Sequence, residues 1–122
     1  MATKIPVFED SYVAGADLST HQWKGVMLTS ANTVGLQGAT GQSLGVLQNK
    51  PRQGEAACVM HIGRSPAYAD GSGTAIAVGD LVRPGTGGVF VKATAGEANI
   101  IGVAEEACTI AGGIISITLD FF

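Results

Sequence analysis

Hydrophobic and polar positions alternate over short runs in the last part of the chain, and glycine closes each run. Between residues 76 and 119 the runs cover 77–82, 89–94, 100–105 and 114–119. The breaks contain turn formers, as in the PGTGG sequence at 84–88. Short β-branched runs bounded by Gly and Pro at intervals of about 10 residues are typical of a small sandwich or barrel. The pattern predicts four strands and no helix.

The same order of runs and breaks occurs earlier in the chain, at residues 24–29, 33–37, 43–48 and 55–62. Residues 25–28 match 79–82, and residues 33–36 match 88–91. We infer two related four-strand halves, at about 24–63 and 75–122. Closing the halves on one another would remove the exposed sheet edges of each. The sequence therefore predicts an all-β fold, a small Gly-rich barrel or sandwich, with residues 64–74 as the connection.

Residues 1–23 differ from the rest, because they mix charged with apolar residues and show no helical period. Pro6 is unsuited to a central strand. We interpret this segment as an extended N-terminal arm that becomes ordered on contact with a partner. An edge strand and loop of the same domain is the alternative. The candidate anchors on a partner are Ile5, Val7, Phe8, Tyr12 and Trp23.

Charged residues make up only 14% of the 122 residues, below the usual ~25%. The surface must therefore be covered by small and polar residues or by a partner. The net charge is −3, and the seven Lys and Arg are scattered, which argues against a nucleic-acid partner. No apolar run reaches the ~18 residues of a membrane span and no signal-peptide-like run is present, so we expect a soluble chain made without obvious export.

Residues able to carry chemistry are few. Cys58 and Cys108 stand 50 positions apart without metal-ligand spacing, and small buried thiols are favoured over a disulfide. His61 is predicted to be a partly exposed residue on a sheet face. Glu105 and Glu106 would point to opposite faces of a strand, so they cannot act as a pair. The sequence predicts no enzyme, no metal or cofactor and no small-molecule ligand.

The stretch from residue 44 to residue 119 resembles the decoration, or cement, proteins of tailed-bacteriophage heads. The residues that carry the resemblance are NKPxxGE at 49–55, AIAVGDLV at 75–82, KATAG at 92–96, IGVAxEA at 101–107 and GIISI at 113–117.

The resemblance implies a non-enzymatic protein on the outer capsid surface of the virion that holds neighbouring major capsid subunits together. It further implies a homotrimer and an N-terminal arm that adds a strand to the capsid subunit. Few charges and an extended segment are compatible with both roles. The alternative is another virion part built on a Gly-rich β domain, such as a head fibre base, a tail tube or a spike.

Overall fold

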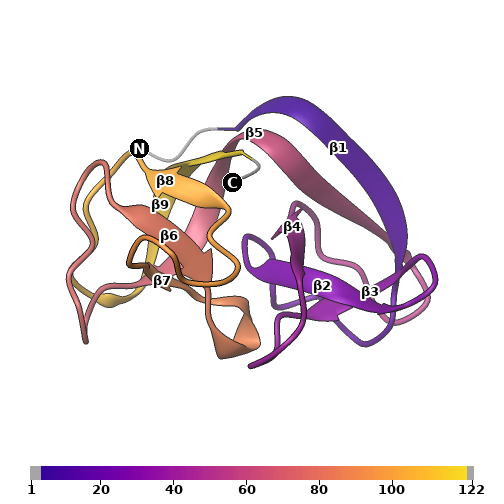
Figure 1. The fold of residues 1–122 in the computed structure, drawn as a ribbon. Helices are drawn as coiled ribbons and strands as arrows, with labels where there is room; N and C mark the ends of the chain where they lie inside the picture. The colour runs from indigo at the N-terminus through magenta and orange to yellow at the C-terminus, as the bar shows by residue number, and fades with distance from the viewer. Residues whose placement is uncertain (1–3, 121–122) are drawn as a thin grey trace.

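The computed structural model describes residues 4–120 and shows nine strands in one continuous sheet (Figure 1). The strands are β1 (Ile5–Ala14), β2 (Gly25–Ser30), β3 (Thr33–Leu36), β4 (Ser43–Leu47), β5 (Ala56–Asp70), β6 (Leu81–Pro84), β7 (Phe90–Lys92), β8 (Gly102–Ala104) and β9 (Ala111–Leu119). A three-residue 3₁₀ turn, Thr86–Gly88, is the helical element of the described chain. The all-β class predicted from the sequence is confirmed.

The strand pairings close into two rings that share β5. In the first ring the order is β1-β3-β2-β4-β5, with β5 returning to β1. In the second ring the order is β5-β7-β6-β8-β9, with β9 returning to β5. Figure 1 shows the rings side by side, with β5 passing from one to the other. The expectation that the two halves close a single barrel is therefore wrong in this detail, because β5 has 15 residues and serves both rings.

The two rings repeat one pairing pattern. β1 pairs with β3 in parallel, as β5 does with β7. β2 lies antiparallel between β3 and β4, as β6 does between β7 and β8. β4 pairs with β5 as β8 pairs with β9. Each unit thus has five strands, not four, and the first half of β5 ends one unit while its second half begins the next.

Two segments that were not predicted as strands, residues 5–14 and 64–70, each form the first strand of a unit. Residues 5–14, expected as an arm, form β1 and pair with β5 from Ile5↔Arg64 to Val13↔Ala56. Residues 64–70, expected as a connection, continue β5 and pair with β9. Of the two interpretations of the N-terminal segment, the structure thus shows the strand of the same domain for residues 5–14.

Pro66 is tolerated in the middle of β5 because no neighbouring strand pairs with the edge of β5 at the position where its backbone N–H would be needed. Its partner Ser116 directs its backbone N–H to Glu106 and its carbonyl to the N–H of Glu105, both away from β5. The backbone of Pro66 therefore faces the opposite edge of β5. On that edge β1 reaches only Arg64. A proline can occupy such a position without removing a ladder hydrogen bond.

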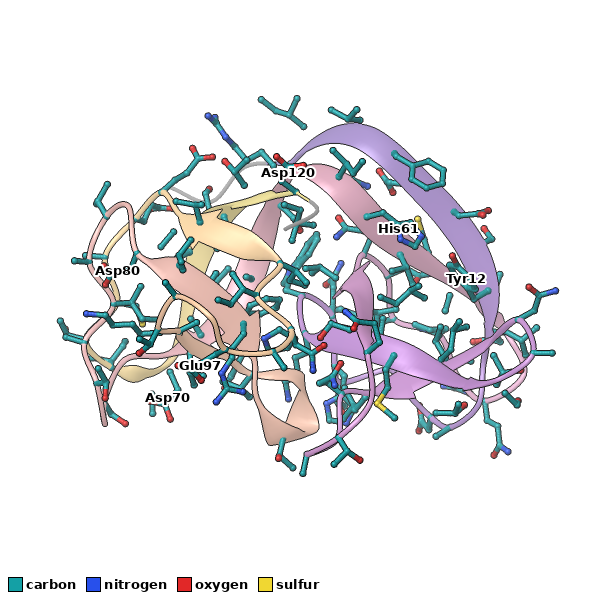
Figure 2. All side chains as sticks on the ribbon, in the orientation of Figure 1. Tyr12, His61, Asp70, Asp80, Glu97 and Asp120 are labelled. Carbon is teal, nitrogen blue, oxygen red and sulfur yellow. The ribbon has the colours of Figure 1, made fainter. Side chains whose placement is uncertain are left out.

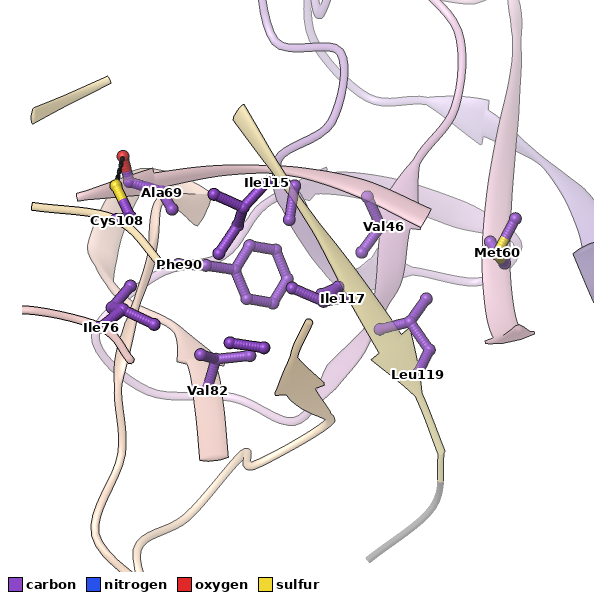
Figure 3. Close-up of a cluster of buried hydrophobic side chains, with 12 residues drawn as sticks. Val46, Met60, Ala69, Ile76, Val82, Phe90, Cys108, Ile115, Ile117 and Leu119 are labelled. Carbon is purple, nitrogen blue, oxygen red and sulfur yellow. Dashed lines mark hydrogen bonds between the residues drawn. The ribbon is translucent and has the colours of Figure 1, made fainter. Parts of the chain in front are cut away.

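Each ring has its own hydrophobic core. The core of the second ring surrounds Phe90, which is fully buried between Ile76, Val82, Ile115 and Ile117 (Figure 3). The core of the first ring contains Ala14, Leu18, Val26, Val34, Leu47, Ala57 and Val59. Val46 of β4 and Met60 of β5 join the core around Phe90, whereas their neighbours Leu47 and Val59 face the core of the first ring, as the alternation of a strand requires.

Glycines let the two rings approach closely. A Cβ atom on Gly25 would lie 2.4 Å from Cβ of Pro84, and one on Gly88 would lie 2.4 Å from the carbonyl oxygen of Gly25. The Gly87 N–H donates to the Gln37 carbonyl across the same junction at 2.8 Å. The absence of a side chain on these glycines thus lets the two rings meet through direct backbone contact.

Removing β1 tests whether it is part of the domain. Deleting residues 1–14 should remove the whole β1–β5 ladder and expose the first core, because Ala14 is 1% exposed and Tyr12 packs against that core. A loss on the order of 5 kcal/mol in the free energy of unfolding is comparable with total domain stability. Thermal unfolding followed by circular dichroism should show no cooperative transition for the first ring. An unchanged unfolding midpoint would mean that β1 is a dispensable arm.

Candidate protein-binding surface on strand β1

Exposed apolar side chains gather on the first half of β1. Ile5 is 55% exposed, Val7 74% and Phe8 48%. We call these three residues the β1 surface. Large apolar side chains that stay exposed next to one another are a mark of contact with another molecule. The sequence had singled out the same three residues as anchors, and the structure brings them together on one strand.

Two compensating bulges shape this part of β1. Pro6 pairs with Gly63 and Phe8 with Ile62, so Val7 is an extra residue in β1. Glu9 then pairs with Met60, which leaves His61 as the extra residue in β5. Bulges re-aim side chains and end regular pairing. Here they leave Val7 standing clear of the sheet, and they place His61 against Phe8.

The His61 side chain stacks against Phe8. The centroids of the imidazole and phenyl rings lie 4.9 Å apart, and the angle between the ring planes is 24°. Tyr12 Oη lies 2.9 Å from His61 Nε2, and the backbone of Leu44 forms a hydrogen bond with the same imidazole. Figure 2 shows Tyr12 and His61 side by side between β1 and β5.

Tyr12, another of the predicted anchors, makes contacts within the domain. It is half-buried, packs against the first core and bonds inward to His61. Trp23 lies apart from β1. Its backbone N–H donates to Leu47, and its carbonyl accepts from Tyr68 at the edge of β5. The structure thus joins three of the five predicted residues into one surface. His61, which sequence reasoning had treated as an ordinary sheet residue, is added beneath them.

Lys4, Glu9 and Cys58 form a small polar cluster beside the apolar residues. Lys4 Nζ lies 3.1 Å from Glu9, and the Cys58 thiol donates to the same carboxylate at 2.9 Å. Burial opposes ionisation of Glu9, yet the hydrogen bonds from Cys58 and Lys4 lower its pKa overall. Burial and the neighbouring Glu9 raise the pKa of Cys58 to about 11. This thiol stays protonated at neutral pH and is no nucleophile.

The outer edge of β1 is protected against pairing with a further strand. Val13 and Gly15 direct their N–H groups outward to Asn32 and Val34, so by alternation Ser11 faces the same edge. The Ser11 N–H is already bonded to the Asp10 carboxylate at 2.8 Å. Pro6 lacks an N–H group, and the Val7 bulge distorts the edge. Proline, bulges and charges are the devices that keep natural strand edges from pairing.

The remaining candidates for chemistry are accounted for. Cys58 and Cys108 are free thiols, so the alternative of a disulfide is wrong. Glu105 binds Arg64, whereas Glu106 accepts from the Ser116 N–H. Among residues 4–120 no group of three His, Cys, Asp or Glu side chains is placed to hold a metal ion. None of the helical structure described has the length and apolar character needed to cross a membrane.

Protonation of His61 should weaken the support beneath Phe8. Burial lowers the pKa of His61 below its ordinary value of 6.5, against smaller opposing effects of the Leu44 hydrogen bond and Asp10. The folded protein then binds the proton less well than the unfolded chain does. Stability is complete above pH 6.5 and decreases as the pH falls from 6.5 towards the folded pKa.

His61→Gln should remove this part of the pH dependence, since glutamine can still accept from Tyr12. The measurement is the midpoint of urea unfolding at several pH values between 7 and 5. His21→Gln removes the separate contribution of His21, whose pKa burial and Lys24 also lower, and should leave the contribution of His61 in place. Equal pH dependence in the wild type and His61→Gln would contradict this role of His61.

The fold and surface define a class: an all-β module of two rings that presents an apolar strand at one end. The sequence matches no family model. No curated protein is significantly similar to it. Among solved structures, the fold is similar to that of the head fibre gp8.5 N base of bacteriophage phi29, with a TM-score of 0.69, 93% of each chain covered and 14% sequence identity. At this identity the likeness shows a shared fold.

Proposed function

We propose that this chain is a non-enzymatic structural module of a tailed-bacteriophage virion that binds the outer surface of the head through the β1 surface. One observation carries the proposal: Ile5, Val7 and Phe8 stand exposed on a rigidly paired strand, in a fold shared with the base of a phage head fibre. The sequence resemblance to capsid decoration proteins supports the same location. The partner is the major capsid protein.

Contact is made by side chains, and not by adding β1 to a sheet of the capsid. The edge of β1 is closed by Pro6, the Val7 bulge and the Asp10–Ser11 hydrogen bond. Exposed side chains of a strand that is already folded lose little freedom on binding, which favours affinity. Strand addition by a disordered arm would require β1 to leave β5 and open the first ring.

Decoration would stabilise the head by mass action. A module that binds neighbouring subunits only in the assembled capsid, and not free subunits, lowers the free energy of the assembled state. The close backbone junction between the rings suits this role, because multivalent binding is lost where the geometry forbids simultaneous contacts. Many copies, each weakly bound, then strengthen the particle together.

The base of a head fibre is the second candidate, and the fold likeness favours it specifically. Both candidates attach to the head, but a fibre base also carries material that projects outward. A cryo-EM reconstruction of the virion tests both. We expect two-lobed density on the outer head surface that contacts the capsid through β1. Projecting density above each copy would select the fibre base. Copies located only in the tail would overturn the proposal.

A further inference from the structure

A small cavity lies where the two rings meet, beside the β1 surface. Its volume is about 40 Å³, and both rings contribute to its lining. The first ring supplies residues 42–45 at the start of β4 and His61 of β5, whereas the second ring supplies Ile100, Ile101 and Asp120. We call it the Asp120 cavity. Binding pockets often form where two structural units meet.

Hydrogen bonds hold the walls of the Asp120 cavity together. The Asp120 N–H donates to the Ile101 carbonyl at 3.0 Å within the second ring. The Asn99 side chain reaches across to the first ring, where it accepts from the Ser43 N–H at 3.0 Å and donates to the Gly41 carbonyl at 2.8 Å. A group that enters the cavity therefore meets walls that are already in place, which favours affinity.

The lining combines aliphatic walls with a negative charge. Leu44, Ile100 and Ile101 are partly buried aliphatic residues. Among the described residues of the lining, Asp120 carries a charge at pH 7, and none is a lysine or an arginine. Burial lowers the pKa of His61 below its usual 6.5, so its imidazole is mostly neutral at pH 7. The cavity is therefore suited to a cation.

His61 connects the Asp120 cavity to the β1 surface. Its imidazole lines the cavity and also stacks against Phe8, which is 48% exposed. Asp10 of β1 interacts electrostatically with the same imidazole, so a second carboxylate is close by. In Figure 2 His61 lies between β1 and β5, and Asp120 lies just beyond the end of β9. A partner that covers Phe8 would bring its own side chains to the edge of the cavity.

We propose that the Asp120 cavity binds the end of a lysine side chain contributed by the molecule that the β1 surface contacts. The methylene groups of lysine pack against Leu44, Ile100 and Ile101, and its ammonium group pairs with the Asp120 carboxylate. The inference rests on the proposed function, because the lysine belongs to the head surface.

Size selects lysine over arginine. A cavity needs roughly 10–15 Å³ of this kind of volume for each water-sized group, so about 40 Å³ admits about three such groups. An ammonium with its last methylene groups fits that space, whereas the larger, planar guanidinium exceeds it.

NMR titration of the purified full chain with N-acetyl-lysine amide tests the cavity without heads. The amide signals of Ile101 and Asp120 should shift saturably, with a Kd on the order of 10 mM. N-acetyl-norleucine amide, which has a similar aliphatic stem and no charge, should bind about 10-fold more weakly. Asp120→Asn keeps the size of the side chain and removes its charge, so it should reduce the response to the lysine compound to that of the norleucine compound.

Binding to purified heads tests where the lysine comes from. Asp120→Asn should pellet with heads about 10-fold more weakly and with a smaller dependence on salt, because one charged contact is lost. Asp70→Asn is the matched control, since it removes the same charge from the second ring outside the lining of the cavity. Its asparagine can still accept from the Ser72 N–H, and it should bind as the wild type does.

The two experiments fail independently. The cavity is not a lysine site if the wild type shows no saturable response to N-acetyl-lysine amide, or an equal response to the norleucine compound, or the same response after Asp120→Asn. Equal binding of wild type and Asp120→Asn to heads would exclude the head surface as the source of the lysine. A response to the lysine compound without any binding to heads would refute the proposed function and support the cavity.

Discussion

Replacing Ile5 and Val7 together by aspartate should abolish attachment to phage heads while the protein stays folded. Both side chains are more than half exposed, so aspartate costs little in the free chain. In the complex each carboxylate would be desolvated against apolar groups. Hot-spot residues at the centre of an interface cost about 2 kcal/mol or more when they are altered, so the double variant should bind about 100-fold more weakly.

The measurement is the fraction of labelled protein that pellets with purified heads over a range of concentrations. Leu28→Asp provides the control, because it places a carboxylate at an exposed apolar position on β2, away from β1. It should bind as the wild type does. If Ile5→Asp/Val7→Asp pellets with unchanged affinity, the β1 surface is not the site of attachment.

Gly63→Ala should cause a large loss of stability, because Gly63 is where both rings meet on β5. It pairs with Pro6 of β1 on one side and with Leu119 of β9 on the other. Its φ of +133° lies in a region that side chains rarely adopt. A Cβ atom there would lie 2.5 Å from the Ile5 carbonyl oxygen and 2.9 Å from the Val7 nitrogen.

Strain and overlap together should lower the free energy of unfolding by about 3–5 kcal/mol, and Tm by roughly 15 °C. Gly73→Ala is the matched control, because Gly73 has no positive φ and nothing lies within 4 Å of its would-be Cβ. Its Tm should stay within a degree or two of the wild type, since surface changes of this kind cost under ~0.5 kcal/mol. Equal midpoints for the two variants would show that the junction tolerates a side chain.

The strands that were predictable from the sequence are those made of β-branched and aliphatic residues between glycines. β2 and β9 lie where the pattern of Val, Ile and Gly places them. β1 could not be recognised by alternation, because residues 5–8 are exposed on both faces. The second half of β5 was hidden by Pro66, whose place in a gap between neighbouring strands depends on the complete topology. The internal repeat contains a signal for β1. If a strand at residues 64–70 precedes β6 in the second unit, an equivalent strand must precede β2 in the first unit.

The candidate site was predictable in part for a similar reason. Ile5, Val7 and Phe8 stand out as apolar residues in a segment without a period. Their common exposure follows from that lack of a buried face. The roles of Tyr12 and His61 depend on a contact across 49 positions of sequence, set by two bulges that no local pattern records. Trp23 is aromatic like Phe8, but its place at the junction of the rings follows from backbone bonds to Leu47 and Tyr68.

Co-sedimentation of the wild-type chain with expanded and unexpanded heads of its own phage tests the central claim most directly. We expect saturable binding to expanded heads at a fixed ratio to the major capsid protein. That ratio gives the number of copies on each head and therefore the kind of site that they occupy. Absence of binding to either form of the head would contradict the account and would indicate that the module belongs to another part of the virion.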